Sequence, residues 1–223
     1  MADIAHELRT PLSVMQLKLE NYQQAGHHVP PEMLLRLHDE VIRLSQLVDD
    51  LHILSLAESG RLSLERKPLD LAMHLERIVD DVKYEAEENG LDVCLYTISS
   101  PVTVMADARR ITQVFINLLT NAIRYTPRGG KITVKIEDRV FERNAFFACV
   151  SVIDTGIGIP AEELPHLFDR FYRVDEARSR HTGGTGLGLS IAHHFVKAHC
   201  GFIRVASQSD EGTKFTVFLP IGQ

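Results

Sequence analysis

A histidine near the start of the chain lies where it could act as a nucleophile. The apolar residues after it recur at alternating spacings of four and three, which is typical of a helix packed against others: Leu8, Leu12, Met15, Leu19 and Tyr22. At about 100° per residue, His6 lies on the opposite face of this helix, and Thr10 lies within about 40° of His6. We therefore expect an imidazole and a hydroxyl to project together into water. A solvated surface histidine would give the same pattern.

A later helix is predicted to carry a stripe of polar side chains. Asn117, Asn121 and Arg124 are spaced at i, i+4 and i+7, which places them on one face, just before Tyr125. Amide oxygens and a guanidinium group suit a hydrated Mg²⁺ ion with phosphate oxygens, because hard cations take oxygen ligands. An ordinary solvated face remains the alternative for this segment alone.

An acidic residue leads from a predicted apolar strand into a glycine turn. Asp154 follows residues 146–153, and Gly156 and Gly158 come directly after it. A half-buried carboxylate needs a donor partner, and the amino group of adenine would serve. The glycines remove Cβ atoms where a planar base would approach the backbone. A plain turn after a strand is the alternative.

Two further segments could contact phosphate. Phe168 and Phe171 are interpreted as aromatic anchors of a mobile lid from which Arg173 could reach phosphate, although an ordinary surface loop would look the same. The glycine-rich stretch 183–189 runs into a helix, whose bare N-terminal amides would bind anions; its candidate residues are Gly184, Thr185, Gly186, Leu187 and Gly188. Its spacing fits neither GxGxxG nor GxxxxGK[ST], so it predicts neither a Rossmann site nor a Walker loop.

Composition limits the possible functions. The formal net charge of −6 and the lack of a basic stripe argue against nucleic-acid binding. Three cysteines fit no metal spacing or disulfide framework. No apolar run approaches the roughly 18 residues of a membrane span. Because the first helix begins so close to His6, we expect a region upstream of this chain.

The elements divide the chain into two predicted domains, residues 1–61 and 62–223. Helices 3–24 and 32–58 form the first, and the second helix has its own apolar seam: Leu34, Leu37, Val41, Leu44, Val48 and Leu51. Two antiparallel helices cannot bury both seams alone, which favours a homodimeric four-helix bundle; a monomer with the hairpin folded on the second domain is the alternative.

The second domain is predicted to be an α/β sandwich with a mixed, largely antiparallel sheet and three helices. We expect helices at 71–89, where Asp70 is the N-cap, at 108–125 and at 187–199. The expected strands are 62–69, 93–98, 102–105, 131–138, 146–153, 202–207 and 214–219. The fold class is therefore α+β overall.

Taken together, these segments resemble the catalytic core of the sensor histidine kinases of two-component signalling. The stretch from His6 to Leu12 resembles the phosphoacceptor motif of that family, and the four later segments resemble its nucleotide motifs in the same order. The resemblance covers essentially the whole chain and implies a dimerization and histidine-phosphotransfer hairpin followed by an ATP-binding domain of the Bergerat type. Arg124 stands where the family usually has lysine.

The resemblance also implies a mechanism. ATP and Mg²⁺ would bind with adenine on Asp154, the metal on Asn121 and Asn117, and the triphosphate over Gly184–Gly188. His6 would attack the γ-phosphorus while Glu7 accepts the proton of the other imidazole nitrogen. The phosphoryl group would pass to an aspartate of a response regulator, and Thr10 would orient water for its dephosphorylation. The chain would be the cytoplasmic portion of a protein anchored in the cell membrane.

Other functions remain open at this stage. A Bergerat-type ATPase, or a nucleotide-binding dimerization module without phosphotransfer, would share the glycine motifs but would not need His6 and Glu7 on an exposed helix face. A non-enzymatic dimeric scaffold would need the heptads but not Asp154, Asn121 and Arg173 together. A zinc peptidase is excluded because Thr10 stands where HExxH requires a second histidine.

Overall fold

The computed structural model describes residues 2–24, 30–98, 101–174 and 185–221. Within these ranges, the side chains of residues 2–7, 10, 23, 24 and 138 are outside the description. The chain divides into two compact units, residues 1–53 and 54–223. We describe each unit by itself.

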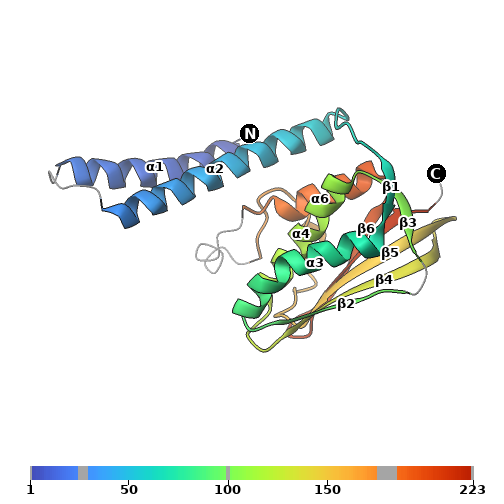
Figure 1. The fold of residues 1–223 in the computed structure, drawn as a ribbon. Coiled ribbons are helices and arrows are strands. Elements are labelled where there is room, and N and C mark those ends of the chain that lie inside the picture. The colour runs from blue at the N-terminus through green and yellow to red at the C-terminus, as the bar shows by residue number, and fades with distance from the viewer. Residues whose placement is uncertain (1, 25–29, 99–100, 175–184, 222–223) are drawn as a thin grey trace. The chain divides into compact units, whose positions relative to one another are not determined.

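The first unit consists of a helical hairpin. Helix α1 (Ala2–Gln24) and helix α2 (Pro31–Glu58) run antiparallel (Figure 1), as the apolar periodicity predicts. Pro11 lies inside α1. Over the described residues, neither these helices nor those of the second unit are long and apolar enough to cross a membrane.

The apolar seam predicted for α2 is only partly buried within one chain. Leu34, Val41 and Val48 are 55%, 53% and 51% exposed, whereas Met33 and Leu47, outside the predicted seam, are buried. This is what the expected shortage of cover within one hairpin implies, because α1 covers only one line along α2. The remaining apolar line faces away from the hairpin and is available for another partner.

The second unit contains the sheets and the remaining helices. In chain order its elements are β1 (Lys67–Asp70), α3 (Leu71–Glu88), β2 (Asp92–Tyr96), β3 (Thr103–Ala106), α4 (Ala108–Tyr125), β4 (Lys131–Glu142), β5 (Ala145–Asp154), the short 3₁₀ helix η1 (Leu164–His166), α6 (Gly188–Ala198), β6 (Phe202–Gln208) and β7 (Gly212–Pro220).

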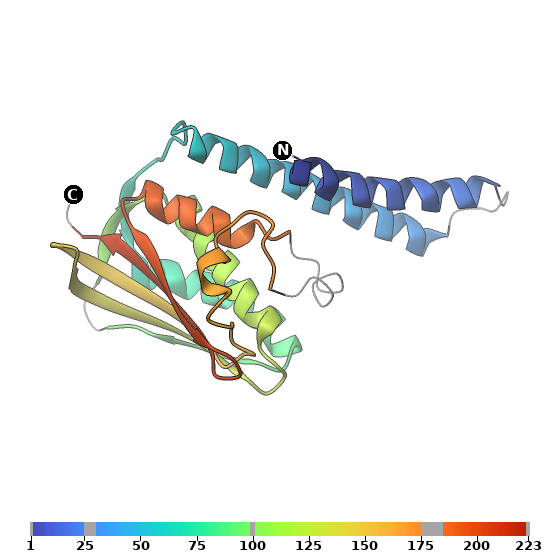
Figure 2. The same cartoon turned by 180° about the vertical axis from the view of Figure 1, so that it is seen from behind.

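Five strands form one mixed sheet in the order β2-β4-β5-β7-β6, in which only β2 and β4 run parallel. A separate two-stranded sheet pairs β1 with β3. Helices α3, α4 and α6 cover one face of the five-stranded sheet (Figures 1 and 2). The helix-facing side chains of β5, such as Val150 and Val152, are buried against them. The predicted α/β sandwich is therefore confirmed.

Two aspartates fix where helices begin. Oδ1 of Asp70 accepts hydrogen bonds from the backbone N–H groups of Ala72 and Met73, which makes it the predicted N-cap of α3. Asp107 caps α4 in the same way. Such caps typically contribute about 1 kcal/mol each.

The first predicted strand is shorter than expected. Only Lys67–Asp70 pair with β3, and the residues before them make other bonds. The backbone N–H of Glu65 donates to Oδ2 of Asp107, and the Arg66 guanidinium donates to the carbonyl of Ala198. The segment that enters this unit is therefore held by side-chain bonds rather than by strand pairing.

Candidate functional site

Asp154 is the last residue of β5 and is the acid best placed to recognise a ligand. It is buried, and burial raises its pKa, while the backbone N–H groups of Gly156 (2.9 Å) and Thr213 (3.2 Å) act in the opposite direction by donating to Oδ1. Within the described part of the chain, no protein donor reaches its other oxygen. That oxygen is therefore free to accept a hydrogen bond from a ligand.

The glycine turn after Asp154 leaves no room for side chains. A Cβ atom on Gly156 would lie 2.6 Å from the carbonyl oxygen of Tyr125. Gly158 has a φ of +68°, and a Cβ atom there would lie 1.9 Å from the carbonyl oxygen of Gln208. The N–H of Ile157 also donates to the carbonyl of Tyr125 at 3.2 Å. The turn is thus packed between the end of α4 and the β6–β7 connection, and this packing requires glycine at both positions.

The polar stripe of α4 lies beside the start of α6. Nδ2 of Asn117 donates to the carbonyl of Gly188 at 2.8 Å, and a Cβ atom on Gly188 would lie 3.3 Å from the Asn117 amide carbon. Asn121 is half-buried, and its side-chain amide makes no hydrogen bond to another described residue. The structure therefore brings Asn117 together with the glycine segment and leaves the Asn121 amide without a protein partner in the part it describes.

Arg124 and Tyr125 are both exposed at the end of α4. Arg124 lines a hollow of about 440 Å³ between α3 and α4, together with Glu85, Asn89, Thr120, Ile123, Thr126 and Arg128. In this structure its guanidinium is therefore not joined to Asn117. A long exposed side chain near a helix end can turn to either side of that helix, so helical spacing alone does not fix its direction.

The aromatic segment, residues 168–174, contacts the glycine segment, residues 185–188. The N–H of Phe171 donates to the carbonyl of Gly186 at 3.0 Å. Gly186 has a φ of +71°, and a Cβ atom there would lie 2.8 Å from Cα of Phe171. Arg173 is half-buried in the aromatic segment. Gly184 lies outside the described residues, as does the part of the predicted lid that follows Val174.

The glycine segment ends in a helix start. Oγ1 of Thr185 accepts a hydrogen bond from the N–H of Leu187 at 3.4 Å, Leu187 is fully buried, and α6 begins at Gly188. The segment therefore presents main-chain amides at a helix N-terminus, where an anion is favoured.

The residues predicted to act in phosphotransfer and in dephosphorylation of the regulator lie on α1, in the first unit. His6, Glu7 and Thr10 have helical backbone, and their side chains are outside the described atoms.

Several contributors to the site carried no signal in the sequence. The backbone N–H of Thr213, at the start of β7, completes the cradle of Asp154, and Oγ1 of Thr155 accepts from the N–H of Lys131 at 2.9 Å. A main-chain donor can come from almost any residue type, so no motif marks it.

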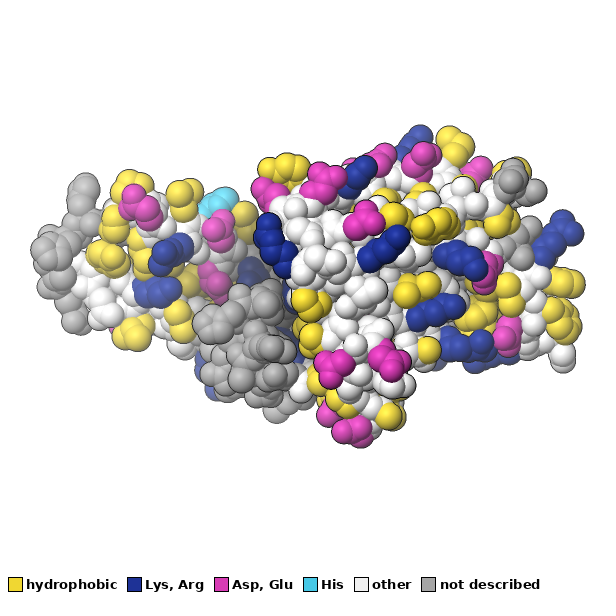
Figure 3. All heavy atoms as spheres, turned by 90° about the horizontal axis from the view of Figure 1, so that it is seen from below, with side chains coloured by type: hydrophobic (Ala, Val, Ile, Leu, Met, Phe, Trp, Pro, Cys, Tyr) yellow, Lys and Arg dark blue, Asp and Glu magenta, His cyan; other side chains and the backbone are white. Residues whose placement is uncertain are grey.

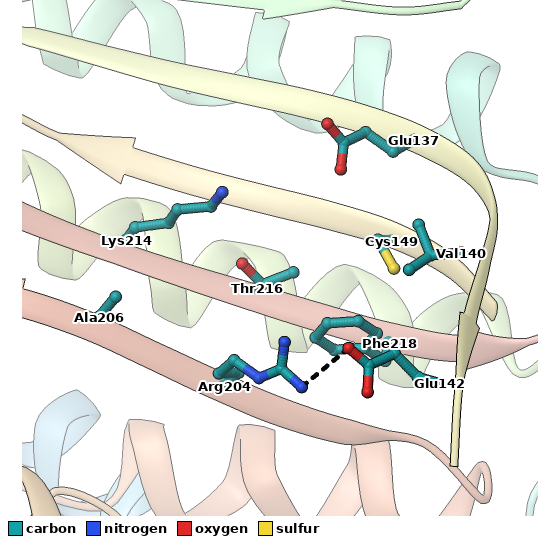
Figure 4. Close-up of a pocket in the computed structure, with 9 residues that line it drawn as sticks. All are labelled: Glu137, Val140, Glu142, Cys149, Arg204, Ala206, Lys214, Thr216 and Phe218. Atoms are coloured by element: carbon teal, nitrogen blue, oxygen red, sulfur yellow. Dashed lines mark hydrogen bonds and ion pairs between the residues drawn. The ribbon is translucent and has the colours of Figure 1, made fainter. Parts of the chain in front are cut away.

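The sheet face that the helices do not cover has a separate hollow of about 240 Å³ (Figure 4). It contains none of the predicted site residues. Glu142 and Arg204 form an ion pair of 3.1 Å at one end, and Cys149 lies at its floor, where burial raises the pKa of the thiol to about 12. On the face in Figure 3, lysine and arginine side chains are interspersed with acidic and hydrophobic ones.

Two family models match the chain. The model described as "Histidine kinase-, DNA gyrase B-, and HSP90-like ATPase" matches residues 106–223, and "His Kinase A (phospho-acceptor) domain" matches residues 1–60. The first match contains Asp154 and the glycine segment, and the second contains His6.

Curated relatives are also histidine kinases. The chain is 38% identical over 221 residues to the signal transduction histidine-protein kinase BaeS of Escherichia coli (strain K12), covering 99% of this chain and 46% of that protein. It is 36% identical to the sensor histidine kinase WalK of Bacillus subtilis (strain 168), covering 99% of this chain and 36% of that protein. The chain thus spans less than half the length of these relatives.

The solved structures that are similar to this chain include histidine kinases as well. The histidine kinase AdeS of Acinetobacter baumannii is 30% identical with a TM-score of 0.80, covering 98% of both chains. The histidine kinase ThkA, solved in complex with the response regulator protein TrrA, is 26% identical with a TM-score of 0.73, covering 98% of this chain and 60% of that one.

Proposed function

Because the chain belongs to the sensor histidine kinases, we propose that it is an ATP-dependent protein-histidine kinase that phosphorylates itself on His6. The phosphoryl group then passes to an aspartate of a response regulator. We divide the chain between a phosphotransfer hairpin, residues 1–61, and an ATP-binding domain, residues 62–223.

The cradle of Asp154 is the observation that carries this proposal. One carboxylate oxygen is held by two backbone N–H groups, and the other is left to accept the amino group of adenine. The glycines that follow let the turn pack against the backbone of Tyr125 and Gln208, which fixes the turn beside Asp154. The residues present therefore fit an adenine nucleotide, with Tyr125 at the rim.

The triphosphate fits the other end of the site. Main-chain amides of Thr185, Gly186, Leu187 and Gly188 lead into α6, and Gly184 and Arg173 would add to the same anion site. Arg124 would reach it by turning away from its hollow. Asn121 and Asn117 would hold Mg²⁺ through amide oxygens, since Asn117 uses only Nδ2 to bond Gly188. Mg²⁺ when bound supplies neutralisation of phosphate charge.

His6 supplies the nucleophile in this proposal. A neutral imidazole nitrogen attacks the γ-phosphorus in line while the bond from that phosphorus to the β–γ bridging oxygen breaks and ADP leaves. Glu7 accepts the proton of the other ring nitrogen, which offsets the positive charge that develops on the ring. Thr10, on the same face, positions water for dephosphorylation of the regulator. The phospho-acceptor family match over residues 1–60 and the ThkA complex with TrrA support these roles.

The exposed apolar line of α2 supports a homodimer. Leu34, Val41 and Val48 recur every seven residues and are each more than half exposed. A second hairpin would bury them in a four-helix bundle. We expect the chain to act as the cytoplasmic portion of a longer, membrane-anchored protein, since its relatives are more than twice as long. Val41→Glu should lower the dimer fraction measured by sedimentation velocity. The control is Met73→Glu on α3, where Met73 is exposed, and it should leave the dimer fraction unchanged.

Labelling with γ-³²P ATP and Mg²⁺ tests phosphotransfer. Wild type should acquire an acid-labile label, and His6→Gln should acquire none while it still binds ATP. Asp154→Asn should bind ATP more weakly and acquire less label at the same ATP concentration. Label that persists in His6→Gln would reject His6 as the acceptor. ATP hydrolysis without any label would favour the Bergerat-type ATPase instead.

A further inference from the structure

A histidine on α6 stacks on the aromatic segment. The rings of His193 and Phe168 lie 4.9 Å apart between centroids, with only 26° between their planes. Both side chains are half-buried. Nothing in the predicted nucleotide motifs includes His193, yet it lies on the helix that the glycine segment opens.

The surroundings of the stacked His193 ring favour its uncharged form. Burial lowers its pKa most, and the neighbouring His194 and Lys197 lower it further. His194 meets it edge-on, with 5.8 Å between the ring centroids. The contact with Phe168 is therefore one between two flat neutral rings, a geometry that another aromatic side chain could reproduce.

The aromatic segment needs such a support because its backbone is not relaxed. Phe171 has a φ of +62°, a left-handed conformation that is unfavourable for any residue with a Cβ atom. The hydrogen bond from its N–H to Gly186 holds one end of this conformation. The stack of Phe168 on His193 holds the other end. The aromatic segment is thus attached to α6 and to the turn before it at two separate points.

We propose that His193 is a positioning residue for the triphosphate: its ring, through Phe168, holds the aromatic segment with Arg173 against the phosphate-binding glycine segment. This rests on the proposed function. The adenine end of the site depends on Asp154, Gly156 and Thr213, whose hydrogen bonds do not involve the aromatic segment. Removing the stack should therefore weaken binding of phosphates and spare binding of the base.

Binding of ATP and of adenosine, measured separately, tests this selectivity. His193→Ala should bind ATP about threefold to tenfold more weakly, as expected for one aromatic pair, and adenosine as wild type does. His193→Phe should restore ATP affinity because it keeps a flat ring over Phe168. The matched control is His194→Ala, because the ring of His194 does not stack on Phe168. This variant should bind ATP with wild-type affinity.

A double-mutant cycle with Phe168→Ala tests whether His193 acts on ATP binding through Phe168. If His193 acts through Phe168, the double variant should bind ATP no more weakly than the weaker single variant. Thermal unfolding of each variant confirms folding. Equal losses for ATP and adenosine, additive losses in the cycle, or no rescue by His193→Phe would overturn the proposal.

The two proposals fail differently. Wild type that binds no ATP would overturn both. Wild type that binds ATP without labelling His6 counts against phosphotransfer alone, because the His193 test reads binding and not transfer.

Discussion

The backbone N–H of Asp107 donates a 2.9 Å hydrogen bond to Nε2 of the buried His199, so one imidazole ring joins the start of α4 to the end of α6. Nδ1–H of the same ring donates to the carbonyl of Phe195 at 2.7 Å. Both ring nitrogens are therefore used by the neutral form, and a proton on Nε2 would break the bond to Asp107.

Stability should consequently fall in mild acid. Burial lowers the pKa of His199 below its ordinary value of 6.5, with Arg66 acting in the same direction. Well above pH 6.5 the ring is neutral in both states and its contribution is complete. As pH falls further, the unfolded chain takes up the proton first, so stability is lost until the folded pKa is reached. The unfolding free energies of wild type and His199→Gln, measured with urea, should therefore converge as the pH falls from about 7.5 through 6.5.

His74 and His193 also have lowered pKa values and would contribute to the pH dependence of stability. Both remain in wild type and in His199→Gln, so the comparison of these two proteins isolates His199. Their contribution cancels in the difference between the two unfolding free energies. Parallel curves for wild type and variant would show that His199 does not titrate with folding.

Two glycines with similar backbone angles should respond differently to alanine. Gly158 (φ +68°) and Gly129 (φ +87°) both lie in the left-handed region, but only at Gly158 would a Cβ atom meet backbone, 1.9 Å from the Gln208 oxygen. Gly129→Ala should cost about 1–2 kcal/mol for the conformation alone. Gly158→Ala should cost about 1–3 kcal/mol more because the turn must shift. Urea unfolding measures both, and equal costs would contradict the predicted close approach.

The sequence predicts elements well where a local signal marks both ends. The helix expected at 108–125 is α4 with the same bounds, because Asp107 caps its start and Pro127 follows its end. The strand expected at 62–69 is mostly absent, because pairing depends on how far β3 extends, and the strand's own residues do not report that.

In the candidate site, too, residues with a local sequence signal could be predicted and those that depend on folding could not. Asp154, Gly156 and Gly158 could be predicted because residue type and spacing carry their chemistry. The N–H of Thr213 and the ring of His193 could not, since one is a main-chain group and the other acts through a stack formed only on folding. The direction of Arg124 depends on a side-chain rotation that helical spacing leaves free.

Cys200 should be replaceable by glycine with a gain in stability. It follows the C-cap of α6 with a φ of +61°, and two bonds characteristic of a Schellman motif surround it: Cys200 N–H to Lys197 O and Gly201 N–H to Val196 O, both 2.9 Å. Glycine removes the left-handed penalty and should raise the unfolding free energy by about 0.5–1 kcal/mol. Cys200→Ala, which keeps a Cβ atom, should bring no gain. A less stable glycine variant would contradict the assignment.

Asp154→Asn should change which base is bound as well as how tightly. The variant can keep its Oδ1 on the N–H groups of Gly156 and Thr213, so the fold should persist. Its Nδ2 then replaces the oxygen that would accept from adenine, and two donors face each other. ATP affinity should fall by about tenfold to a hundredfold, as for the loss of a hydrogen bond to a charged group.

Guanine carries a carbonyl oxygen where adenine carries its amino group, so the same substitution should reduce the preference for ATP over GTP. Competition of both nucleotides with a fluorescent ATP analogue measures this ratio. Ser151→Ala, on the uncovered face of the sheet where Ser151 bonds Thr216, is the control and should leave the ratio unchanged. If Asp154→Asn keeps the wild-type ratio while losing affinity for both nucleotides, the carboxylate supports the turn and does not read the base.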